Sequence, residues 1–109
     1  MHEYIQIMTT VEQQKDAETI VQELLHKRLA ACVQIIGPIK SYFWWQDKIE
    51  KAAEYLCLIK SRRDLYPQAE EAIREVHPYE VPEIIAVPIA AGSGRYLQWL
   101  ETELRAAEQ

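Results

Sequence analysis

The alternation of apolar and polar side chains predicts four β-strands in this chain. Each candidate segment is rich in β-branched, aromatic or aliphatic residues. The expected strands are Tyr4 to Thr10, residues 30–45, Lys48 to Lys60 and Ile84 to Ile89. The last one is almost continuously apolar, which is typical of a strand buried on both faces. Gly37-Pro38 and Pro88 interrupt the second and fourth strands, and because proline has no backbone donor, both strands are expected at sheet edges.

Apolar residues at helical spacing predict two helices between strands and a third after the last strand. The first helix is expected from Glu12 to Arg28, with Thr10 and Gln13 at capping-box spacing. Asp64 is expected to cap the second helix, with Pro67 in its first turn. The apolar stripe of the C-terminal helix is Tyr96, Leu97, Leu100 and Leu104.

The element order is β-α-β-β-α-β with an added C-terminal helix. This order predicts an α+β fold, the ferredoxin-like or split βαβ sandwich, whose second and fourth strands lie at the edges. The proline positions agree with those edges. At 109 residues the chain has the size of a single domain, which we expect to span 1–109.

The hairpin formed by the second and third strands is expected to outrun its own sheet. At about 3.3 Å per residue, a strand from Lys48 to Lys60 extends roughly 40 Å, about twice the usual length. Four aromatic residues, 42–45, lie at the tip beside the Gln46-Asp47 turn. Aromatic surface of that size is costly in water, so the rings are expected to contact another subunit or, alternatively, to fold back over their own domain. An apolar edge strand also favours pairing with another chain, which together with the hairpin predicts a closed homo-oligomer.

Composition excludes several classes of function. The apolar fraction of 49% and the charged fraction of 27% are typical of a soluble globular protein. A net charge of −5 without a basic tract argues against nucleic-acid binding. No apolar run approaches membrane-spanning length and no signal core precedes the first strand, so we expect a cytoplasmic protein. Cys32 and Cys57 are expected to be free thiols there.

Six segments, taken together and in order, match a known family over almost the whole chain. They are Arg28-Leu29-Ala30-Ala31-Cys32-Val33, Ser41-Tyr42-Phe43-Trp44-Trp45, Lys48-Ile49-Glu50, Ile59-Lys60-Ser61, His77-Pro78-Tyr79-Glu80-Val81-Pro82-Glu83 and Tyr96-Leu97-Gln98-Trp99-Leu100. The chain thereby resembles the CutA divalent-cation-tolerance family. The resemblance implies a homotrimer similar in architecture to the PII signalling proteins and linked to tolerance of copper and other divalent ions. The chain departs from the family at the Gln46-Asp47 turn, where a glycine is common, and in lacking further cysteines that members can carry.

The resemblance makes Cys32 the candidate copper ligand, and a soft thiolate with an imidazole partner suits that metal. His77 is the candidate partner by type, and Glu80 supplies a nearby carboxylate. Two other interpretations stay open: Cys32 as an unreactive strand thiol, and His77 as the residue that ends the second helix. The sequence contains no CxxC, no paired histidines at ligand spacing and no acidic calcium loop, so only weak metal binding is expected, without an obligatory cofactor.

The connector from His77 to Glu83, stiffened by two prolines, offers a second kind of site. Tyr79 and Glu83 on the connector, with Trp44 and Lys60 on the hairpin, are expected to line a cleft between subunits. An alternative function is therefore a PII-like module that takes a small organic anion through Lys60. A third hypothesis is a trimer that presents a surface to an unknown protein partner. No nucleophile elbow or phosphate loop occurs, so we do not expect an enzyme.

Overall fold

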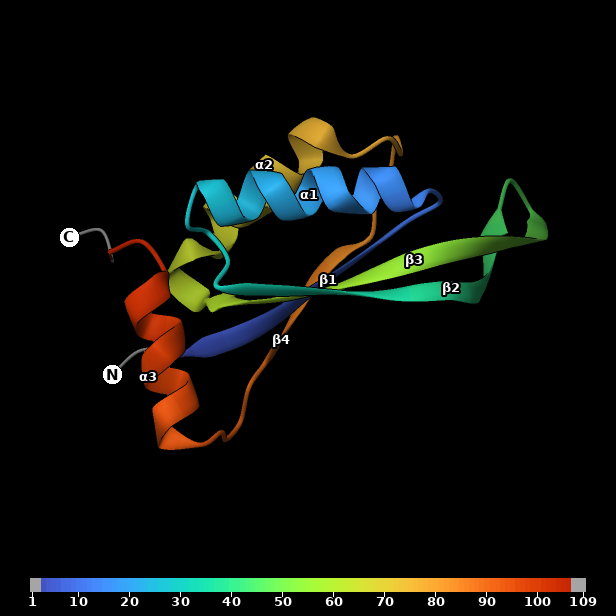
Figure 1. Cartoon of the computed structure of the whole chain (residues 1–109). Helices are drawn as coiled ribbons and strands as arrows, with labels where there is room; N and C mark the ends of the chain where they lie inside the picture. The colour runs from blue at the N-terminus through green and yellow to red at the C-terminus, as the bar shows by residue number, and fades with distance from the viewer. Residues whose placement is uncertain (1–2, 107–109) are drawn as a thin grey trace.

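A four-stranded antiparallel sheet in the order β2-β3-β1-β4 organises the chain (Figure 1). The computed structural model describes residues 3–106. Its elements are β1 (Tyr4–Val11), α1 (Gln14–His26), β2 (Cys32–Trp45), β3 (Lys48–Arg62), a 3-10 turn (Arg63–Leu65), α2 (Tyr66–Val76), β4 (Ile84–Pro88) and α3 (Gly94–Glu103). This order confirms the predicted α+β, ferredoxin-like fold with β2 and β4 at the edges.

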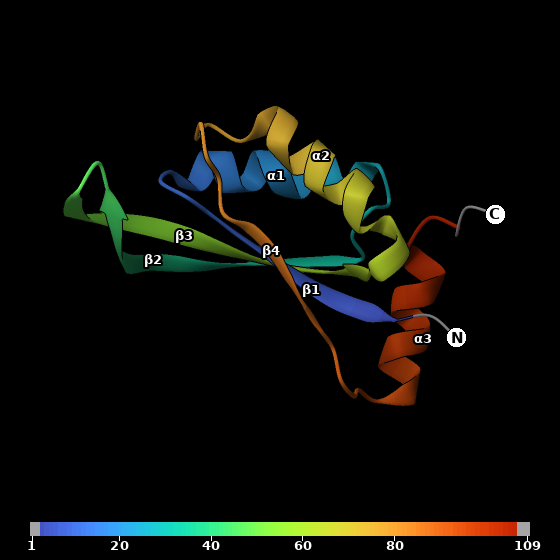
Figure 2. The same cartoon turned by 180° about the vertical axis from the view of Figure 1, so that it is seen from behind.

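The hydrophobic core lies between one face of the sheet and helices α1 and α2 (Figure 1). Its largest members come from both layers and are completely buried: Ile7, Ile20, Leu24, Ile59 and Ile73. Helix α3 instead lies at the end of the sheet, beside the start of β1 and far from the hairpin tip, as both views show (Figures 1 and 2). None of the helices within residues 3–106 is long and apolar enough to cross a membrane.

The β2–β3 hairpin extends well beyond the other strands (Figure 2). Its ladder runs from Cys32 opposite Lys60 to Trp45 opposite Lys48, which confirms the predicted long hairpin. The bend is also confirmed, because the register shifts at Gly37-Pro38. A Cβ at Gly37 would lie 2.6 Å from the ring of Tyr55, so only glycine fits there.

The hairpin turn differs in residue type from a glycine turn but not in geometry. Gln46 and Asp47 have φ values of 50° and 64°, in the left-handed region that two-residue hairpin turns require. Aspartate tolerates this region better than most residues do, because its short side chain can hydrogen-bond locally. The departure at this turn is therefore compatible with a tight connection between the two strands.

Both predicted side-chain caps are wrong. Thr10 belongs to β1, and Gln13 occupies the N-cap of α1 without a side-chain cap bond. Leu65 occupies the N-cap of α2, while Asp64 pairs with Arg62. A buried arginine attracts the carboxylate more strongly than a helix start does, which explains the second error. Pro67 does lie in the first turn of α2, as predicted.

Strand β4 is less buried in the single chain than its apolar sequence predicts. Ile85 and Val87 are 49% and 42% exposed, respectively. Their cross-strand partners, Met8 and Gln6, alternate with core residues of β1, so this side of the strand faces away from α1 and α2. The prediction of burial on both faces is wrong for the isolated chain, because no helix covers the middle of this face (Figure 1).

Candidate functional site

The connector between α2 and β4 is anchored by His77. His77 is 9% exposed, and its Nδ1 accepts a hydrogen bond from the backbone N–H of Tyr79 at 3.1 Å. Nε2 therefore carries the proton and donates to the Thr10 carbonyl at 3.0 Å, with the Thr9 hydroxyl 3.1 Å from the same nitrogen. Burial lowers the pKa of His77, since it disfavours the charged ring. Both ring nitrogens are engaged within the chain, and the ring holds the connector against β1.

Tyr79 continues this network to the hairpin. Its hydroxyl donates to Oε2 of Glu54 at 2.6 Å, and Glu54 is only 6% exposed. Burial, followed by the hydrogen bond to Glu54, raises the pKa of Tyr79 well above its usual value, so the phenol stays protonated and remains a donor. The ring of Tyr79 also contacts the ring of His77, with centroids 4.9 Å apart.

A groove of about 440 Å³ opens between this connector and the hairpin, and we call it the connector groove. It is lined by Phe43, Trp44, Trp45, Glu54, Tyr79, Glu80 and Val81. Of the predicted site residues, Trp44, Tyr79 and Glu80 thus come together, and the hairpin of the same chain forms the second wall. Glu83 is exposed and does not line this groove, and neither does Lys60.

Glu54 is the residue of this groove that sequence reasoning missed. An acidic side chain in the middle of a strand pattern usually faces solvent. The available signal was its position between Ala53 and Tyr55, where it interrupts a largely apolar stretch of β3. Its partner lies 25 residues away, so only the fold reveals the pair.

Cys32 belongs to a different cluster, on the sheet face that α1 and α2 leave uncovered. It lies opposite Lys60, whose ammonium donates to the side-chain carbonyl of Gln34 at 2.6 Å. Cys32 also interacts with the phenol of Tyr96 on α3; burial and then this neighbour raise the pKa of Tyr96. Tyr96 as a neighbour of Cys32 was not predicted.

The two cysteines are separate, unpaired thiols. Cys32 is half-buried, whereas Cys57 is completely buried in the core beneath the helices. Burial raises the pKa of Cys57 to about 11, which keeps it protonated and unreactive. Only Cys32 is therefore placed to offer a thiolate to a ligand.

Cys32 and His77 do not meet within one chain. Lys60, opposite Cys32, pairs with Gln6 on β1, whereas His77 bonds to Thr9 and Thr10 farther along the same strand. Within the described part of the chain, no three His, Cys, Asp or Glu side chains gather as ligands for one metal ion. A metal bound by both residues would need atoms from more than one subunit, together with release of the His77 hydrogen bonds.

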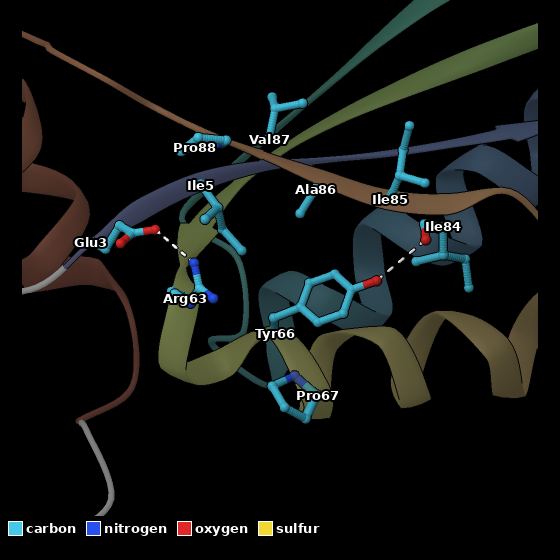
Figure 3. Close-up of a pocket in the computed structure, with 10 residues that line it drawn as sticks. All are labelled: Glu3, Ile5, Arg63, Tyr66, Pro67, Ile84, Ile85, Ala86, Val87 and Pro88. Atoms are coloured by element: carbon cyan, nitrogen blue, oxygen red, sulfur yellow. Dashed lines mark hydrogen bonds and ion pairs between the residues drawn. The ribbon is translucent and has the colours of Figure 1, made fainter.

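A second groove, of about 560 Å³, lies between β4 and the start of α2 (Figure 3). Its polar groups are paired across its width: Glu3 with Arg63 at 3.0 Å, and the Tyr66 hydroxyl with the Ile84 carbonyl at 3.3 Å. The remaining lining is largely aliphatic and includes the edge of β4. This groove presents an apolar strand edge rather than convergent polar groups.

Comparison with known proteins agrees with this architecture. The family model described as "CutA1 divalent ion tolerance protein" matches residues 5–103. A divalent-cation tolerance protein CutA from Archaeoglobus fulgidus is 41% identical over 101 residues, covering 93% of this chain and 96% of that protein. A solved structure of CutA1 from Oryza sativa superposes with a TM-score of 0.93 at 35% identity, covering 96% of each chain.

The cellular compartments named for these relatives differ. The A. fulgidus protein is described as periplasmic in its solved structure. A CutA 1 protein from Oryza sativa, 37% identical over 101 residues, is described as chloroplastic; the match covers 93% of this chain and 57% of that protein. Similarity alone therefore does not assign a compartment to this chain.

Proposed function

The chain belongs to the CutA1 divalent ion tolerance family, and from this premise we propose that it is a homotrimeric, cytoplasmic protein of divalent cation tolerance. In this proposal it binds copper or other divalent ions weakly, near the subunit interfaces, and has no enzymatic role. The family match over residues 5–103 carries the proposal. The geometry around Cys32 supports the metal-binding part of the proposal.

Cys32 is the strongest candidate ligand because it is half-buried on the uncovered sheet face, where a neighbouring subunit would contact it. One thiolate with a phenol and an amide nearby suits a soft ion such as reduced copper, at modest affinity. Glu80 is an exposed carboxylate on the connector groove. His77 stays a candidate ligand only if a metal displaces its contacts with Thr10 and Tyr79.

Isothermal calorimetry with copper tests this assignment. Cys32→Ser is expected to weaken binding by about tenfold or more, since serine replaces a soft sulfur with a hard oxygen. The matched control is Cys57→Ala, which removes the other thiol from the core and leaves copper affinity unchanged. Unchanged copper affinity in Cys32→Ser combined with His77→Gln and Glu80→Gln contradicts the assignment.

The alternative function, a PII-like module for an organic anion, depends on Lys60. Lys60 is the cross-strand partner of Cys32 on the uncovered sheet face, and its ammonium is bonded to Gln34. A cationic side chain there favours an anion at that face rather than in the connector groove. Stabilisation by a panel of small carboxylates, lost in Lys60→Met, would support this alternative over the metal role; no stabilisation in the panel counts against it.

A further inference from the structure

The connector groove combines aromatic surface with negative charge. Among its described lining residues there is no lysine or arginine, whereas Glu54 and Glu80 both contribute carboxylates. Glu54 is the better fixed of the two, because it is 6% exposed and Oε2 accepts the Tyr79 hydroxyl. Glu54 therefore holds a fixed carboxylate on the wall of the groove, next to the Tyr79 hydroxyl.

The surroundings of the groove reinforce its negative potential. The carboxylates of Glu12 and Asp16, on the loop before α1 and in its first turn, act on Tyr79 together with Glu54 and help to raise its pKa. The lysines of the hairpin nearer its turn, Lys40, Lys48 and Lys51, do not line the groove. An anion would be repelled here, and a cation attracted.

The aromatic part of the groove comes from the hairpin. Strand alternation places Phe43 and Trp45 on the same side as Glu54, and Trp44, which alternates with them, also contributes to the lining. Phe43 and Trp45 are 42% and 49% exposed, so both rings retain open surface. Trp44 is the most exposed of these aromatic side chains, at 72%.

We propose that the connector groove binds a small organic ammonium ion, with its charged head at Glu54 and Glu80 and its apolar body against Phe43 and Trp45. Carboxylates near aromatic faces are a chemistry that recognises such cations. A bare divalent ion would use the carboxylates but gain nothing from the rings, which are not metal ligands. A groove of about 440 Å³ accommodates a molecule of this size. This site goes beyond the proposed metal tolerance and does not depend on Cys32.

Calorimetry with three probes of one shape tests the charge requirement: benzylammonium, benzyl alcohol and benzoate. The wild-type protein is expected to bind benzylammonium at least about tenfold more tightly than the neutral alcohol, and benzoate least, because only the ammonium pairs with the carboxylates. As an independent readout, a Trp99→Phe background leaves only the two hairpin tryptophans, so benzylammonium should change the fluorescence of this variant.

Glu80→Gln and Glu54→Gln are each expected to weaken benzylammonium binding about tenfold. The matched control is Glu83→Gln, which neutralises an exposed carboxylate of the same connector outside the groove and should leave the affinity unchanged. Trp45→Leu should weaken binding while leaving both carboxylates in place. Glu54→Gln can also disturb the contact with Tyr79 and so weaken the fold. Glu80→Gln is therefore the cleaner variant: if its thermal unfolding is unchanged, weaker binding reports loss of the site alone.

Several outcomes overturn the proposal. Equal affinity for benzylammonium and benzyl alcohol shows an apolar groove only, and no saturable binding to the wild-type protein shows a groove closed by another copy of the chain. A third outcome is that copper displaces benzylammonium, with a copper affinity that Glu80→Gln lowers and Trp45→Leu does not change. That combination would assign the carboxylates to a metal site. The Cys32→Ser titration is separate, so either proposal can fail while the other stands.

Discussion

The neutral form of His77 is part of how the connector is held. A buried ring that donates to Thr10 and accepts from Tyr79 uses both nitrogens in opposite roles, which a doubly protonated ring cannot do. Burial is the largest influence and lowers its pKa, while the Thr10 carbonyl and the carboxylates of Asp16 and Glu54 oppose it. Protonation therefore loosens the contact between the connector and β1.

The stability of the protein should consequently fall on mild acidification. Above the ordinary pKa of 6.5, the ring is neutral in both the folded and unfolded states, and its contribution is complete. Below 6.5 the unfolded chain binds a proton that the folded ring resists, so the free energy of unfolding decreases by at most about 1.4 kcal/mol per pH unit for this group. The loss levels off once the pH is below the lowered pKa of the folded ring.

Urea unfolding across this pH range, at one fixed protein concentration, measures the effect. His77→Gln is expected to cost about 1–3 kcal/mol at neutral pH and to remove this part of the pH slope. His26→Gln, at an exposed position of α1, should change neither quantity. A slope that is unaltered in His77→Gln contradicts the role given to this ring.

At the scale of single residues, the sequence predicted which side chains carry chemistry, but not which residues they contact. The connector was recognisable because two prolines, a histidine, a phenol and two carboxylates lie within seven residues. That His77 bonds to β1, 67 residues away, depends on strand pairing that no local pattern specifies. Glu54 was overlooked for the same reason, since in isolation it looks like an ordinary solvated carboxylate.

Among the elements, α3 depends on one buried arginine at the end of β3. The side chain of Arg62 is 1% exposed and contacts Asp64, Glu101 of α3 at 3.0 Å and the Arg105 carbonyl at 2.9 Å. Glu101 also accepts the hydroxyl of Tyr4 at 2.9 Å. Helix α3 lies outside the main helical layer (Figure 1), and this polar network joins it to β1 and β3 in addition to the buried Leu100.

Removing the two carboxylates should cost more stability than removing the arginine. Asp64→Asn with Glu101→Gln leaves a buried guanidinium without a counter-ion, for an expected loss of about 3–5 kcal/mol. Arg62→Met should cost less, because the two carboxylates are 38% and 35% exposed and can be hydrated. Arg63→Met is the matched control: that side chain is 73% exposed, so its pair with Glu3 contributes at most about 1 kcal/mol.

Chemical denaturation together with hydrogen exchange of the α3 amides distinguishes these cases. Faster exchange confined to α3 is expected for Arg62→Met, and none for Arg63→Met. Equal effects of the two substitutions would contradict the idea that Arg62 fastens α3.

The order of the elements followed from hydrophobic periodicity, and the edge positions of β2 and β4 followed from their prolines. Both signals are local in the sequence, and both agree with the ferredoxin-like topology. The helix caps failed because the predicted capping groups had stronger alternatives: Thr10 continues β1, and Asp64 pairs with Arg62. The prediction that β4 is buried on both faces failed because an apolar sequence does not specify whether the same chain or another molecule covers the strand.

At the scale of the whole molecule, the uncovered sheet face is the main unexplained surface of a single chain. Cross-strand register places Met8, Leu58 and Ile85 side by side on it, and Ile36 at the edge is 48% exposed. The hairpin tip separately exposes Trp44, at 72%. Apolar surface of this extent on a small domain favours association.

If this face is the subunit contact of the proposed trimer, a charge placed on it should prevent assembly. Ile85→Glu would place an unpaired carboxylate in each contact, where desolvation costs several kcal/mol in addition to the roughly 1.5–3 kcal/mol of lost apolar burial per chain. The matched control is Leu25→Glu, at a site 39% exposed on α1, in the helical layer on the other side of the sheet. Light scattering should give three chain masses for the wild type and for Leu25→Glu, and a smaller mass for Ile85→Glu.

A wild-type monomer at micromolar concentration, or an undisturbed Ile85→Glu trimer, contradicts this arrangement. A trimer that assembles through the hairpin tip instead would be disrupted by Trp44→Ser while tolerating Ile85→Glu, so the pair of variants identifies which surface holds the chains together.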